Sequence, residues 1–125
     1  MKKLIFVVLA LLLLSACGQK QQEAVYVNIT AQEAKAIMDS EEGYIILDVR
    51  EQDEYDAGHI PGAILIPYTQ IAEKAEEILT DKNQQLLVYC RSGRRSKIAA
   101  EELLKLGYTN IKEFGGIIDW PYEVE

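Results

Sequence analysis

The sequence predicts an α/β domain of three layers, in which a central, mainly parallel sheet of five strands is flanked by helices. Short apolar runs alternate along the chain with segments whose apolar residues recur at helical spacing, which is typical of strand–helix–strand units. The runs at 44–49 and 85–89 are almost continuously apolar, as expected for strands buried on both faces of a parallel sheet. A length of 125 residues suits one such domain.

A segment before this domain carries signals of export. Lys2 and Lys3 precede an apolar run at 4–14, which is shorter than a membrane span of about 20 residues and has the size of a signal-peptide core. The run leads into Leu14-Ser15-Ala16-Cys17, which resembles a bacterial lipobox, where the cysteine receives lipid and becomes the N-terminus. We therefore expect a lipoprotein signal peptide at 1–16, a lipidated tether at 17–24 and the folded domain at 25–125.

This lipobox resemblance implies a protein of the bacterial cell envelope, outside the cytoplasm, that is anchored to a membrane by acyl chains such as palmitate on Cys17. Two alternatives stay open: a secreted protein in which Cys17 is incidental, and an uncleaved run that acts as a weak anchor. The net charge of −7 does not suggest nucleic-acid binding. Nor would such an acidic domain adhere to an anionic membrane by charge alone.

The elements of the domain each have a signal in the sequence. Strands are expected at 25–29, 44–49, 63–66, 85–89 and 108–114. Helices are expected between Thr30 and Gly43, at 51–58, at 71–79, and from the loop after Cys90 to Gly107. Thr30 and Glu33 form a capping-box signature, and glycine is typical just beyond a helix end. The face of the third helix that we expect to be buried consists of Ile71, Ala72, Ala75, Ile78 and Leu79.

The segment from Cys90 to Ser96 links a buried strand to the start of a helix. Unpaired backbone N–H groups at such a start favour an anion, and Gly93 lets the backbone curl. Three arginines add positive charge in an otherwise acidic chain, namely Arg91, Arg94 and Arg95. Because basic residues at a helix start oppose the macrodipole, this pattern favours a reactive thiolate and a small dianionic substrate such as thiosulfate over a buried structural cysteine.

Four motifs, in the same order along the chain, resemble those of rhodanese-like domains. They are Ile46-Leu47-Asp48-Val49-Arg50 with Glu51 and Tyr55, then Gly58-His59-Ile60-Pro61-Gly62-Ala63, then the Cys90 loop, and finally Gly115-Gly116 with Trp120. The resemblance covers the chain from about Val25 to the end. It implies a rhodanese-like fold and a sulfurtransferase of the thiosulfate type.

The resemblance also implies roles for single residues. Cys90 would attack the outer sulfur of thiosulfate, release sulfite, hold the sulfur as a persulfide and pass it to a thiol or to cyanide. The loop residues Arg91, Ser92, Gly93, Arg94 and Arg95 would bind the substrate, and no metal or organic cofactor is implied. Asp48, Arg50 and Ser96 would support the site: Asp48 and Arg50 follow a strand and are expected to form an ion pair, with a substrate role for Arg50 left open.

Other interpretations of the same residues stay open. Cys90 could hold a persulfide handed over by a partner protein, which would make the chain a carrier. Phosphatases and arsenate reductases of this fold use cysteine-x5-arginine; here the sixth residue after Cys90 is Ser96 and Arg95 lies one short, which favours sulfur. Two cysteines and one histidine cannot furnish a full protein-ligated zinc site. His59 is expected to stabilise a turn, and Trp120 to close the hydrophobic core.

Overall fold

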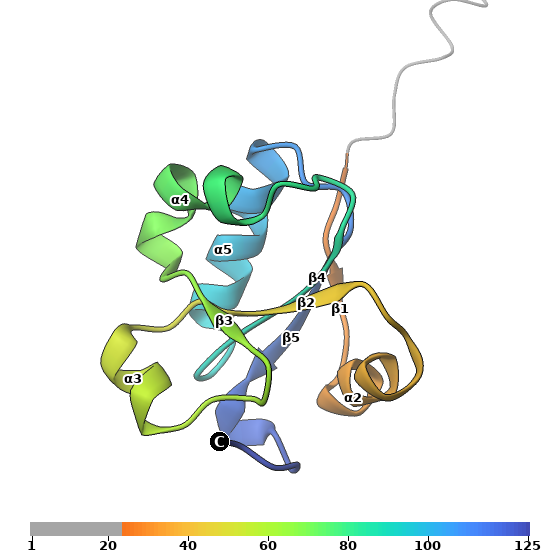
Figure 1. The fold of residues 1–125 in the computed structure, drawn as a ribbon, viewed down its shortest axis with the longest axis vertical. Helices are drawn as coiled ribbons and strands as arrows, with labels where there is room; N and C mark the ends of the chain where they lie inside the picture. Colours follow the sequence, from red (N-terminus) through yellow and green to blue (C-terminus); the bar gives the residue numbers. More distant parts are fainter. Residues whose placement is uncertain (1–23) are drawn as a thin grey trace, which may run out of the picture.

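The computed structural model describes residues 24–125, so the expected signal peptide and all but the last residue of the expected tether lie outside the described residues. Five parallel strands form a sheet in the order β1-β5-β4-β2-β3, and helices lie on both sides of it (Figure 1). The strands are β1 (Val27–Asn28), β2 (Tyr44–Asp48), β3 (Ile64–Leu65), β4 (Gln85–Cys90) and β5 (Ile111–Gly116). The helices are α2 (Ala31–Ser40), α3 (Gln52–Ala57), α4 (Ile71–Ile78) and α5 (Arg94–Lys105), with short 3-10 turns η1 (Tyr68–Gln70) and η2 (Ile117–Asp119). The predicted fold class is confirmed.

The central strand β4 divides the core into two apolar clusters. All six of its residues are buried, as the continuous apolar run predicts. Leu86, Val88 and Cys90 belong to the cluster that includes the buried apolar residues of α4 and α5. Leu87 and Tyr89 belong to the cluster on the other face, which includes Ala34 of α2, Phe114 and Trp120. Because side chains alternate along a strand, one strand supports both faces of the three-layer arrangement.

Local signals fix the ends of two helices as expected. The Glu33 N–H donates to Thr30 Oγ1 at 3.0 Å, and the Thr30 N–H donates to Glu33 Oε1 at 3.1 Å, so the capping box is present. At the end of α5, Gly107 has φ of 96°, and the Tyr108 N–H donates to the Leu103 carbonyl at 3.1 Å. This left-handed residue turns the chain out of the helix and towards β5.

Two expectations about elements were wrong in detail. β5 begins at Ile111 and not at 108, because the chain is still leaving α5 at Tyr108, and it continues through Gly116, which pairs with Cys90. Ala72 and Ile78 of α4 are exposed, although their apolar character suggested burial. The helix is only eight residues long, and its buried stripe is narrower than the predicted face.

Because the strands are parallel, they all begin at one edge of the sheet and end at the other. The carboxyl ends of the strands lie together, so Asp48 and Cys90, the last residues of β2 and β4, share one edge. β1 begins at the opposite edge, where the described part of the chain enters the domain (Figure 1). Within residues 24–125, no helix has both the length and the apolar character needed to cross a membrane.

Candidate active site

Cys90 lies where a fully buried strand meets the loop before α5. Its side chain is 1% exposed, and it is the free cysteine of the described residues. Gly93 has φ of 103°, a left-handed conformation that costs glycine little, and this turns its N–H onto Cys90 Sγ at 3.0 Å. Ser96, in the first turn of α5, places its Oγ 3.4 Å from the same sulfur. The loop therefore wraps hydrogen-bonding groups around one thiol.

The surroundings of Cys90 favour its ionised form. Burial raises the pKa of the thiol, but hydrogen bonds from the Ser96 side chain and from the backbone N–H groups of Ser96, Gly93 and Ser92 lower it further than burial raises it. The pKa of Cys90 consequently lies below its ordinary value. A lowered pKa leaves more thiolate at neutral pH, and the thiolate is the nucleophilic form.

The three loop arginines are placed differently from one another. Arg91 and Arg94 are exposed, and the Arg94 guanidinium lies 5.9 Å from the centre of the Tyr68 ring. Arg95 instead reaches Glu54 of α3, with its two terminal nitrogens 2.6 and 2.8 Å from the two carboxylate oxygens. This contact raises the pKa of Arg95 and lowers the pKa of Glu54 to about 2. Arg91 and Arg94 are thus more exposed to solvent than Arg95.

Asp48 and Arg50 form the expected ion pair at the same edge of the sheet. Arg50 Nη2 lies 2.7 Å from Asp48 Oδ2 and donates to the Gly58 carbonyl at 2.8 Å, and the Tyr89 hydroxyl donates to Asp48 Oδ2 at 2.7 Å. Burial lowers the pKa of the Arg50 guanidinium, but the contact with Asp48 outweighs burial and leaves it raised. Arg50 and Arg91 both line a cavity of about 490 Å³, which brings the pair close to the loop.

A buried carboxylate beside the Cys90 loop was missed at the level of sequence. Glu113 of β5 is 2% exposed; it accepts the Ser96 hydroxyl at 2.5 Å and the Gly115 N–H at 2.8 Å. Lys97 Nζ lies 3.4 Å from its other oxygen. The sequence pattern could have identified this buried carboxylate. Glu113 stands two residues after Ile111, so both side chains lie on the same face of the strand, where buried positions are usually apolar. Glu54 gave no such signal, since it looks like any acidic residue of an exposed short helix.

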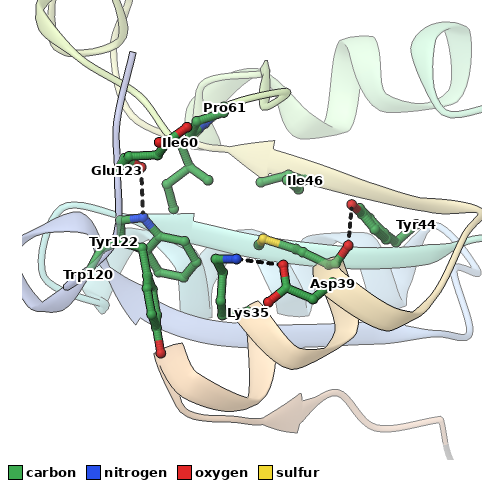
Figure 2. Close-up of a pocket in the computed structure, with 10 residues that line it drawn as sticks. Lys35, Asp39, Tyr44, Ile46, Ile60, Pro61, Trp120, Tyr122 and Glu123 are labelled. Atoms are coloured by element: carbon green, nitrogen blue, oxygen red, sulfur yellow. Dashed lines mark hydrogen bonds and ion pairs between the residues drawn. The ribbon is translucent and has the colours of Figure 1, made fainter.

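The contacts of His59 and Trp120 are packing and hydrogen-bond contacts within the fold. The His59 ring stacks on Tyr55 with centroids 3.8 Å apart, and its Nδ1 lies 2.9 Å from the Tyr55 carbonyl. Trp120 packs against Phe114 and donates its indole N–H to the Glu123 carbonyl at 3.1 Å. Figure 2 shows Trp120 at one wall of a second cavity, of about 510 Å³, between α2 and the C-terminal segment. Cys90 does not line this cavity.

Comparisons with known proteins give a family match and several named relatives. The family model described as "Rhodanese-like domain" matches residues 30–121. The chain is 38% identical over 98 residues to "Putative sulfur carrier protein YrkF" of Bacillus subtilis, covering 78% of this chain and 52% of that protein. It is 40% identical over 73 residues to "Thiosulfate sulfurtransferase PspE" of Escherichia coli, covering 58% of this chain and 70% of that protein. The chain thus spans about half the length of the first of these relatives.

Solved structures show the same fold. A rhodanese-related protein from Thermoplasma volcanium superposes with a TM-score of 0.69 at 32% identity, covering 80% of this chain and 98% of that one. A structure described as rhodanese with anions from E. coli superposes with a TM-score of 0.62 at 35% identity, covering 66% and 96%. The family resemblance of the four motifs is confirmed by these matches. Among residues 24–125, no group of three or more His, Cys, Asp or Glu side chains is placed to hold a metal ion.

Proposed function

The chain belongs to the rhodanese-like domain family, and from this membership we propose that it transfers a sulfane sulfur from thiosulfate, or a similar donor, to a thiol or cyanide acceptor through a persulfide on Cys90. The relatives named as sulfurtransferase and sulfur carrier support a role in sulfur transfer. The observation that carries the proposal is the convergence of the Gly93 N–H and the Ser96 side chain on Cys90 Sγ, together with the lowered pKa of that thiol.

The proposed reaction has two steps at one sulfur atom. In the first, the Cys90 thiolate forms a bond to the outer sulfur of thiosulfate, and the bond between the two thiosulfate sulfurs breaks, so that sulfite leaves with its electron pair. In the second, the acceptor attacks the outer sulfur of the persulfide, and the electron pair of the S–S bond returns to Cys90. The backbone N–H groups of the loop stabilise the negative charge in both states.

The three loop arginines differ in how they would contact the donor. Arg91 and Arg94 are exposed and orient the sulfonate of thiosulfate, while the charge of Arg95 is offset by the contact with Glu54. That contact also argues against phosphate chemistry, because a phosphate cradle needs a guanidinium free to make two hydrogen bonds to the phosphoryl oxygens. With aryl phosphate or arsenate we therefore expect no Cys90-dependent turnover.

A thiosulfate:cyanide assay tests the enzyme, with thiocyanate as the measured product. We expect turnover by the wild-type chain, equal turnover by Cys17→Ser, and loss of turnover by Cys90→Ser. The two serine variants are matched, since they exchange the same atom at the two cysteines of the chain. Turnover that survives in Cys90→Ser would contradict the proposal.

A carrier function is the second candidate, and the relative named as a putative sulfur carrier protein favours it. Chemistry at Cys90 is the same in both, so the assay alone does not separate them. The assay together with mass spectrometry does separate them. A carrier would form no thiocyanate in the assay. Its mass spectrum would show a stable gain of one sulfur atom on Cys90 after exposure to a persulfide donor.

We also propose that Cys17 carries the lipid that anchors the domain to a membrane of the bacterial envelope. Support comes from Leu14-Ser15-Ala16-Cys17 after a short apolar run, which is a sequence argument alone. Expression in a bacterium that processes lipoproteins, followed by intact-mass measurement, tests it. The expected mass is that of a chain starting at Cys17 with acyl groups, and Cys17→Ser should abolish both cleavage at this site and lipid.

A further inference from the structure

A chain of polar contacts runs from Cys90 into the core, away from the loop surface. Cys90 Sγ lies 3.4 Å from Ser96 Oγ, and Ser96 Oγ lies 2.5 Å from Glu113 Oε2. All three side chains are buried, at 1%, 0% and 2% exposure. The path therefore joins a thiol and a carboxylate through one hydroxyl, with little contact to solvent.

The single proton of the Ser96 hydroxyl decides how this chain is ordered. It has three acceptors within reach: Glu113 Oε2 at 2.5 Å, the Gly93 carbonyl at 3.1 Å and the Gly115 carbonyl at 3.4 Å. The carboxylate oxygen is the closest of the three, so it accepts the hydrogen bond from Ser96 in the resting state. Ser96 Oγ is then free to accept the S–H of Cys90.

The contacts of Glu113 favour a single negative charge in this buried region. Its oxygens accept the Gly115 N–H at 2.8 Å and face Lys97 Nζ at 3.4 Å, which stabilise one negative charge. Arg95, whose pKa the charge of Cys90 helps to raise, is paired with Glu54. A thiolate formed two contacts away would place a second negative charge in the same buried region, where repulsion is weakly screened.

We propose that Glu113 is a positioning residue for Cys90 that acts through Ser96, by accepting the proton that the thiol gives up when it becomes a nucleophile. The Cys90 S–H bond breaks as its proton moves to Ser96 Oγ, and the original Ser96 proton moves to Glu113 Oε2. The products are a thiolate, a serine hydroxyl that donates to Sγ, and a neutral carboxyl that donates to Oγ. Protons and net charge are conserved, so no external base is required.

This mechanism predicts an unusual pH profile for the reactivity of Cys90. Wherever one proton is shared between Cys90 and Glu113, a fixed fraction of molecules carries the thiolate, whatever the pH. The rate of alkylation should therefore level off to a plateau on the acidic side of the thiol titration. An isolated thiol shows no plateau, and its rate falls by about tenfold per pH unit below its pKa.

The experiment measures the rate of alkylation by iodoacetamide from about pH 5 to 9, using the full chain with Cys17→Ser so that Cys90 is the single thiol. Glu113→Gln keeps the size and hydrogen-bonding capacity of the side chain. It should lose the acidic plateau and react as fast as the parent, or faster, at alkaline pH, since a negative charge is gone. Ser96→Ala, which breaks the path and keeps Glu113, should lose the plateau too.

Glu101→Gln on the exposed side of α5 is the matched control, since it removes the same charge away from the path, and it should keep the plateau. A purely structural role for Glu113 would lower the rate by the same factor at every pH, and such parallel profiles would overturn the proposal. If Glu113→Gln and Ser96→Ala both fail to fold, the pH profile of the Cys17→Ser chain decides alone. An alkylation rate that falls steadily by about tenfold per pH unit, down to about pH 5, overturns the relay.

The inference rests on Cys90 being the nucleophile of the proposed function, but the two fail separately. Alkylation needs neither thiosulfate nor an acceptor, so the profile is measurable in a chain that shows no sulfur transfer. Conversely, a chain without the plateau that still makes thiocyanate would keep the proposed function and lose the relay.

Discussion

Arg95 and Glu54 show how a single residue can differ from its sequence-based expectation. Arg95 was grouped with the anion-binding arginines, whereas its guanidinium holds both oxygens of Glu54 at 2.6 and 2.8 Å. The contact joins the first turn of α5 to α3. The contact therefore ties the short helix α3 to the start of α5, just after the Cys90 loop.

This pair gives a pH-dependent contribution to stability. The pKa of Glu54 is about 2 in the folded chain, below the ordinary 4.5, because Arg95 stabilises its charged form. Since the folded state resists protonation more than the unfolded state does, the stabilisation is complete above pH 4.5 and is lost as the pH falls towards 2. In urea unfolding, wild type should lose about 1 kcal/mol more than Glu54→Gln over this window, because partial solvation screens the pair.

Asp53→Asn is the matched control for that measurement, because Asp53 is an exposed acidic residue of the same helix. It should keep the wild-type dependence on pH. Equal pH dependence in wild type and Glu54→Gln would show that the contact with Arg95 does not hold in solution.

Cys90 can be identified from the sequence as a candidate site residue, whereas the position of Glu113 beside it cannot. Cys90 was predicted because its signal is local: a strand end, a glycine and basic residues follow one another in the chain. Glu113 is 23 residues away and reaches the site through the pairing of β4 with β5. No single-sequence pattern states which side chain of one strand will meet a hydroxyl on a helix, so its role needs the structure.

The start of α2 shows the opposite case, an element whose end is fixed by neighbours in the chain. Thr30→Ala removes the oxygen that accepts the Glu33 N–H. We expect it to lower the stability by about 1 kcal/mol, which for a domain of this size lowers the melting temperature by roughly 5 °C. Differential scanning calorimetry measures the change. Glu33→Gln, which can keep the reciprocal bond, should have the smaller effect, and a reversed order would exclude the capping box as the cause.

The contact between the Cys90 loop and β5 depends on a missing side chain. A Cβ built at Gly116 would lie 1.8 Å from the Arg91 carbonyl oxygen, with rigid backbone on both sides. Gly116→Ala must therefore displace the loop. We expect the alkylation rate of Cys90 and the thiocyanate yield to fall by about a hundredfold, while the circular dichroism spectrum of the sheet and helices is retained.

A second glycine variant separates this collision from a general effect of alanine. Gly62 has φ of 84°, and open space surrounds the place of its missing Cβ. Gly62→Ala should lower stability by about 1 kcal/mol through backbone strain and leave Cys90 reactivity unchanged. Normal reactivity in Gly116→Ala would mean that the loop tolerates the displacement.

For the whole molecule, the sequence predicted the layers well and the exact bounds less well. Alternating runs were enough to find five strands, because burial on both faces leaves a continuous apolar signal, as in β4. The start of β5 was missed because Tyr108 is buried and apolar although it is not in the sheet. Burial alone does not distinguish a strand from a packed loop, and the exposed Ile78 shows the converse error for a helix.

The direction of β1 has a consequence for the way the domain would stand on a bilayer. Because β1 runs parallel to β5, the described chain enters the sheet at the amino edge (Figure 1). Cys90, the last residue of β4, lies at the opposite, carboxyl edge. With the proposed acyl group on Cys17, the edge of the domain that carries Cys90 would face away from the bilayer. Such an orientation suits water-soluble donors and acceptors that arrive by diffusion, and it would keep lipid-embedded thiols out of reach.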